Sequence, residues 1–324
     1  MGMKKKIILI LLSFVVIVVF SIARDFIIKN IVTVVATNLT GAPTHIGGFS
    51  LSIIKQSIRI SDFKMYNPKE FPRDILVDIP NIGVTCNMGA LLKGKIHFKQ
   101  MDIDLKELGL AKNKQGKLNV DSLKIVEDQK SAKDKGVKKP AKELAIQMDV
   151  VNLSMGRLVN KDYSAEGQPI IKVYDINLKK SYKNITSAQQ LAVLIMSEPL
   201  KAAGIKGAKI YGAMLLTGVA VLPVAAAFTF AGKDYAEGDF NVSWDQAYES
   251  GIKQLERAGK IKSGNQQNGV ISANVNGAGI TLRLKKIKDN KTHIIVSARK
   301  FGLPQVETAA GILYRLSEEL KIAR

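Results

Sequence analysis

The chain has 324 residues, of which 46% are hydrophobic, and its formal net charge at pH 7 is +20. This length allows two domains with separate hydrophobic cores. Nucleic-acid recognition relies on clustered arginines and aromatic platforms. Here the cations are mostly scattered lysines, and only 6% of residues are aromatic. The composition therefore argues against nucleic acid as a partner and favours a solvated or membrane-facing basic surface.

The first predicted element is the uncharged stretch Ile7–Ala23, which follows three consecutive lysines. A helix of this length can just span a bilayer core, and the lysines beside it favour the cytoplasmic side. We therefore expect residues 1–24 to form a cytoplasmic basic tip and a membrane anchor. A cleaved signal peptide is the alternative, because Ser21–Ala23 resembles a peptidase site.

Residues 25–42 are predicted to form an amphipathic helix. Their apolar side chains recur at intervals near 3.6 residues, at Phe26, Ile27, Ile31, Val34, Val35 and Leu39. This helix would either lie on a membrane surface or begin the hydrophobic core.

Residues 43–206 are predicted to form a β-rich domain, because apolar and polar residues alternate with a period of two. In five strands the alternation slips by one residue, after Ile60, Ile79, Phe98, Met148 and Val173. A β-bulge would absorb each extra residue and bend the strand, so that a row of bulges would curl the sheet into a groove. Turns between shorter strands are the alternative reading of the slips.

The inner surface of this groove would be apolar. Its candidate lining residues are Ile58, Ile60, Val77, Ile79, Ile96 and Phe98. For each of them, ordinary core packing under neighbouring helices is the alternative. Within the same domain, residues 127–143 are rich in charge and poor in large apolar residues, which predicts a solvated loop.

A second charge-free stretch, Ile210–Gly232, lies within the predicted segment 207–232. Its length fits a second membrane span, which would return the chain to the cytoplasm. The flanking charges oppose this orientation, since lysines precede the stretch and acidic residues follow it. A hairpin lying in the membrane and a buried element are the alternatives.

Residues 233–324 are predicted to form a small α+β domain. A capping box at Ser243–Gln246 would begin a helix, three strands would follow, and a last helix would carry Val306 and Leu320. The predicted fold class is therefore α+β, with an N-terminal transmembrane helix, a curved and bulged antiparallel sheet that forms a groove, a second apolar helix or hairpin, and this small domain.

The sequence offers no catalytic or cofactor-binding motif. His45, His97 and His293 are far apart, and neither a zinc-binding pattern nor a nucleotide-binding loop is present. The single cysteine, Cys86, lies on an apolar strand and is expected to be a small core residue. We therefore expect a protein that is not an enzyme and that holds neither a cofactor nor a metal.

Several short motifs resemble a known family. They are Gly41–Ile46, Asn67-Pro68, Leu91–Gly94 and Gly116–Leu123. With the basic N-terminal anchor, this pattern is similar to the N-terminal portion of the AsmA-like envelope proteins of Gram-negative bacteria, over about residues 4–207. Separately, residues 234–320 resemble a small bacterial domain of unknown function that is often found in lipoproteins.

The resemblance implies a curved sheet with an apolar inner surface, in a membrane-anchored periplasmic protein involved in phospholipid transport, outer-membrane assembly or envelope maintenance. It places the chain in the inner membrane, as a single- or double-pass protein with its β-rich domain in the periplasm. The implied partners are phospholipid, the inner membrane, and envelope proteins or a second copy of the chain. The alternative function is that of a non-catalytic structural or scaffolding protein of the cell envelope.

Overall fold

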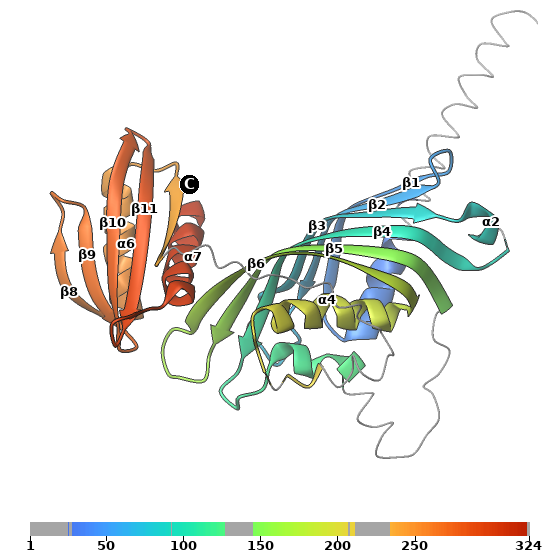
Figure 1. Cartoon of the computed structure of the whole chain (residues 1–324), viewed down its shortest axis with the longest axis horizontal. Helices are drawn as coiled ribbons and strands as arrows, with labels where there is room; N and C mark the ends of the chain where they lie inside the picture. Colours follow the sequence, from blue (N-terminus) through green and yellow to red (C-terminus); the bar gives the residue numbers. More distant parts are fainter. Residues whose placement is uncertain are drawn as a thin grey trace, which may run out of the picture. The chain divides into compact units, whose positions relative to one another are not determined.

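The computed structural model describes residues 25, 28–91, 93–126, 145–206, 208–210 and 234–322. Within these residues the strands form two antiparallel sheets (Figure 1), which we call the first sheet, β1 to β6, and the second sheet, β7 to β12. The chain divides into two compact units, and the two sheets are described separately.

The first sheet is a meander in which each strand pairs with the next along the chain. A short helix, α2 (Met88–Leu91), lies between its third and fourth strands. The strands are β1 (Thr44–Ser52), β2 (Ser57–Tyr66), β3 (Ile75–Cys86), β4 (Ile96–Lys112), β5 (Ala145–Asp162) and β6 (Ile170–Ser187).

The slips of alternation lie inside continuous strands and not at turns. In β2 and β3, Phe63 pairs with Ile79, but Asp62 and Pro80 are left outside the pairing. The backbone of Asp62 has a positive φ of 52°. In β1 the matching residue is Gly47, where an added Cβ would lie 2.7 Å from the Cβ of Asp62. The pairing of β2 with β3 keeps its register on both sides of Asp62, since Ser61 pairs with Asn81 and Phe63 with Ile79, so the predicted bulges after Ile60 and Ile79 are wrong.

At the end of β3, Thr85 pairs with Gln100 but Cys86 pairs with Phe98, which leaves an extra residue in β4 after Phe98, as predicted. The first sheet is visibly curved (Figure 1).

Helix α4 (Ala188–Ala202) lies along one face of the first sheet beside β5 and β6 (Figure 1). The capping-box pattern Ser187–Gln190 in the sequence predicts a helix start here, and α4 begins at it. The Ser187 hydroxyl accepts from the backbone N–H of Gln190 at 3.1 Å, and the Gln190 side chain accepts from the backbone N–H of Thr186 at 2.6 Å. Pro199 lies inside the helix without ending it. Its apolar side chains are buried at Val193, Leu194, Met196 and Leu200.

A buried ion pair ties α4 to β6. The side chain of Glu198 is 1% exposed, and its carboxylate lies 2.8 Å from the Nζ of Lys180 and 3.4 Å from that of Lys201. Burial opposes the ionisation of Glu198, but the hydrogen bond and charge of Lys180 prevail and lower its pKa. The charged carboxylate therefore fixes the position of the helix on the sheet.

The helix over residues 28–40 presents an apolar stripe to solvent. Ile31 and Val34 are more than half exposed, and Val35 is also exposed. The Nζ of Lys29 donates to the backbone carbonyl of Gly47 in β1 at 2.9 Å, so the helix contacts the edge of the first sheet. Of the two predicted roles for this stripe, core formation is therefore wrong for these three residues.

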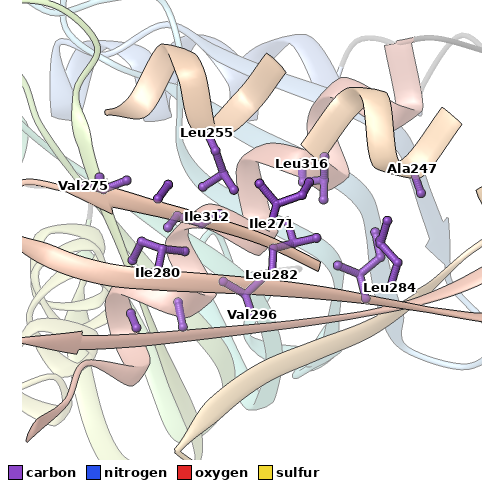
Figure 2. Packing of buried hydrophobic residues seen from close by; sticks show 14 of the residues in the cluster. Ala247, Leu255, Ile271, Val275, Ile280, Leu282, Leu284, Val296, Ile312 and Leu316 are labelled. Carbon is purple, nitrogen blue, oxygen red and sulfur yellow. The ribbon is translucent and has the colours of Figure 1, made fainter. Parts of the chain in front are cut away.

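The second sheet has the order β12-β11-β10-β9-β8, and β7 pairs with β11. Its six strands are β7 (Tyr235–Phe240), β8 (Lys260–Asn265), β9 (Val270–Val275), β10 (Ala278–Lys288), β11 (Lys291–Lys300) and β12 (Leu303–Pro304). The helices α6 (Trp244–Ala258) and α7 (Val306–Ile322) pack on it. Figure 2 shows Leu255 of α6 and Leu316 of α7 directed toward strand residues such as Ile271 and Leu282, and these side chains form one buried core.

The predicted fold class is wrong. The structure is a mixed α/β protein with two sheets, in which about 50% of the described residues lie in strands and 28% in helices. No helix of the described part of the chain is long and apolar enough to cross a membrane. The physical reason is charge as well as length. Five of the 17 residues of α7 are charged, and α4 has only 15 residues and carries Glu198 and Lys201, whereas a span is almost entirely apolar.

The same finding contradicts the predicted inner-membrane localisation as a single- or double-pass protein. The stretches to which the prediction assigned spans, Ile7–Ala23 and all of Ile210–Gly232 beyond its first residue, lie outside the described residues. The predicted basic tip and the predicted solvated loop 127–143 also lie outside them.

Candidate apolar binding surface

The strand register of the first sheet places apolar side chains in rows on one face. Residues that pair directly across antiparallel strands point to the same side of a sheet. From β1 to β4, one row consists of Leu51, Ile58, Val84 and Met101, and the next of Phe49, Ile60, Ile82 and Ile103. A third pair, Cys86 and Phe98, lies beyond the first row. We call these residues, together with Ile96, the apolar face.

Exposure of the apolar face increases toward β1 within each row, and also toward the start of β4 at Ile96 and Phe98. In the first row Met101 and Val84 are 8% and 5% exposed, whereas Ile58 and Leu51 are only half-buried. In the second row only Phe49, on β1, is half-buried. The helices therefore do not fully cover the outer end of the face, which lies beside the β1–β2 turn and α2 (Figure 1).

The six predicted groove residues fall into two groups. Val77 and Ile79 are each 1% exposed and Ile60 is 8% exposed, so these three belong to the closed core. Ile58, Ile96 and Phe98 are half-buried at the outer end. Phe49 and Leu51 lie on the same surface but are not among the predicted groove residues, although they alternate with polar residues along β1 in the same way.

Cys86, inside the apolar face, is fully buried. Burial raises the pKa of its thiol, which keeps it protonated and weakly nucleophilic. Across the described ranges, no group of His, Cys, Asp and Glu side chains is arranged to hold a metal ion. The apolar face thus offers contact area and shape rather than reactive groups.

The opposite face of the first sheet is polar and contains the imidazole of His97. The Oδ1 of Asn87 accepts from the backbone N–H of Ala90, which directs its Nδ2 to the Nδ1 of His97 at 3.1 Å. The Nε2 of His97 lies 2.8 Å from the Oδ2 of Asp149. Because Asn87 donates to Nδ1, Nε2 carries the proton and donates to Asp149. Both ring nitrogens are engaged, which makes this a structural network.

A second histidine network lies on the second sheet. The Nδ1 of His293 is 2.7 Å from Asp239, its Nε2 is 3.3 Å from Glu237, and Lys291 pairs with Asp239 at 2.8 Å. The hydrogen bonds from Lys291 and then His293 lower the pKa of Asp239. The acidic side chains of β7 therefore pair with the basic side chains of the neighbouring strand β11.

Neither a model of any protein family nor any curated protein matches this chain. The resemblance to AsmA-like proteins, drawn from short motifs, therefore stays a prediction, as does the resemblance of residues 234–320 to a lipoprotein-associated domain.

Proposed function

We propose that the chain is a non-catalytic phospholipid-binding protein whose apolar face shelters an acyl chain at its outer end. The observation that carries the proposal is the gradient of burial along the rows. The same face changes from a closed core at Met101 to a half-buried surface at Ile58, Leu51 and Phe98. A ligand that completes this core needs length and apolar surface but no reactive group.

The energetics suit an acyl chain. Each methylene group removed from water contributes about 0.8 kcal/mol. Sheltering about fifteen of them, roughly one acyl chain, would contribute about 12 kcal/mol. After an association cost of about 4 kcal/mol, the remaining 8 kcal/mol or so corresponds to micromolar affinity. A headgroup would remain in water beyond the β1–β2 turn, so the sheet need not bury its charge. Carriage of phospholipid between sites would follow from reversible binding of this strength.

The experiment is a titration of the full-length protein with a fluorescent fatty-acid probe. Phe98→Asp places a carboxylate on the apolar face and is expected to weaken probe binding about tenfold or more, because the charge must be desolvated beside the chain. The matched control is Thr85→Asp: Thr85 is exposed on the opposite face, one residue from the partner of Phe98, and its variant should bind as the wild type does.

Equal affinity for the two variants, with both folded by circular dichroism, would contradict the proposal. A wild-type protein that fails to bind the probe at all would do so as well.

A non-catalytic scaffolding role is the second candidate, and one observation favours it. Phe301, in the turn between β11 and β12, is 94% exposed, and Leu303, the first residue of β12, is 66% exposed. Phe301 also has a positive φ of 52°, a backbone conformation that costs a non-glycine residue free energy. An exposed aromatic side chain in such a turn suits contact with a protein partner. The probe titration separates the candidates, since contact through Phe301 does not require acyl binding at Phe98.

A further inference from the structure

The turn between β1 and β2 holds two isoleucines in water. Ile53 is 59% exposed and Ile54 is 96% exposed. Turns normally use Gly, Asn, Asp, Pro or Ser, each for a conformational reason, and an isoleucine pair has no such role. Exposure of this kind at the end of a sheet points to a function in contact with another apolar phase.

The turn is a fixed structure rather than a loose loop. The backbone N–H of Lys55 donates to the hydroxyl of Ser52 at 3.2 Å, and that of Gln56 donates to the carbonyl of Ile53 at 3.2 Å. The carbonyl of Gln56 accepts from the backbone N–H of Cys86 at 2.7 Å, which fastens the turn to the end of β3. The two isoleucines are thus presented by a rigid sheet. We call residues Ile53–Gln56 the hairpin tip.

The segments of β1 to β4 beside the hairpin tip carry cations and no acidic residue. Residues 50–61 and 86–99 contain these strand ends, and neither segment contains an Asp or Glu. Asp149 of β5, which contacts the second segment, is paired with His97. Both contain exposed cations, at Lys55, Arg59, Lys93, Lys95 and Lys99. An apolar tip with cations on the neighbouring segments complements a phospholipid bilayer: the isoleucines would reach the acyl boundary, and the cations would lie at the level of the anionic headgroups.

We propose that the hairpin tip docks on the surface of an anionic phospholipid bilayer. The proposal rests on the proposed function, since docking here would bring the outer end of the apolar face to the lipid that it takes up. A soluble anion would use the lysines and leave Ile53 and Ile54 in water. Nucleic acid would do the same, with no aromatic platform at the tip for a base to stack on.

The test places a polarity-sensitive dye at the tip of the full-length protein through Ile54→Cys. Cys86 is fully buried, so labelling of the native protein goes to the new thiol. With phosphatidylcholine vesicles containing roughly 30% phosphatidylglycerol, the dye emission should shift to shorter wavelength. A dye at Ser50→Cys, exposed on the other face of β1, should not shift. Inorganic phosphate alone should shift neither.

A second variant tests the charge. Lys93→Glu combined with Lys95→Glu should weaken vesicle binding of the labelled tip about tenfold or more, because each lysine near an anionic surface contributes to the affinity. Emission at position 54 that stays unchanged on anionic vesicles would overturn the proposal, and so would a shift with inorganic phosphate, or an equal shift with purely zwitterionic vesicles.

The acyl-probe titration, repeated on the labelled protein, separates the two proposals. Probe binding without a vesicle-induced shift rejects the docking tip alone. A vesicle-induced shift without probe binding rejects the acyl site and leaves the tip as a membrane contact.

Discussion

Replacing Glu198 by alanine is expected to lower the free energy of unfolding by about 3–5 kcal/mol, the range for breaking a buried ion pair from one side. The variant leaves Lys180, whose side chain is 18% exposed, without its carboxylate partner. It also removes the ion pair between α4 and β6, which leaves α4 held by its buried apolar side chains such as Leu194 and Met196. Urea unfolding followed by far-ultraviolet circular dichroism measures the change.

Lys201→Ala is the matched control for Glu198→Ala. Lys201 lies 3.4 Å from the same carboxylate, but its side chain is 41% exposed. A pair of this kind contributes about 0–1 kcal/mol, because water screens the charge and already solvates it. If both variants lose the same small amount of stability, the buried pair does not hold α4 in place.

Gly259→Ala is expected to destabilise the second sheet by about 3 kcal/mol or more, as overpacking against rigid backbone does. Gly259 follows α6, and a Cβ there would lie 2.1 Å from the backbone oxygen of Asn274 and 3.0 Å from its carbonyl carbon. Asn274 is held in β9 by pairing with Lys260 and Gly279. The obstacle cannot rotate away, so α6 and β9 would have to separate. The φ of Gly259 is −179°, which is ordinary extended backbone, so the expected loss of stability comes from the steric clash and not from backbone strain.

Gly279→Ala is the control in the same sheet. A Cβ at Gly279 would meet only the backbone oxygen of Arg299, at 3.8 Å, which is an ordinary contact. Its stability should stay within about 0.5 kcal/mol of the wild type. Thermal unfolding measures the melting temperatures of both variants. Equal melting temperatures would show that the backbone of Asn274 does not exclude a Cβ at Gly259.

Local signals in the sequence located several features correctly. The slip after Phe98 coincides with a shift in the pairing of β3 and β4, where Thr85 pairs with Gln100 but Cys86 pairs with Phe98, because the extra residue Lys99 must be absorbed there. The capping boxes at Ser187 and Ser243 begin α4 and α6, since a cap is decided within four residues.

Features that depend on distant parts of the chain could not be predicted in this way. Val77 and Ile58 show the same alternation, yet Val77 is fully buried and Ile58 only half-buried, because alternation does not show what covers a face. His97 pairs with Asp149, 52 positions away in the sequence, and no local sequence pattern predicts this contact. The stripe that includes Ile31 has helical spacing whether it faces a core or water.

The most direct test of the central claim is lipid analysis by mass spectrometry of the purified full-length protein and its Phe98→Asp variant. The account predicts phospholipid bound to the wild type in near-equal molar amount, and a loss of most of it in Phe98→Asp but not in Thr85→Asp. Wild-type protein that is folded but free of phospholipid, or equal amounts of lipid in all three proteins, would contradict the claim that the outer end of the apolar face is a phospholipid site.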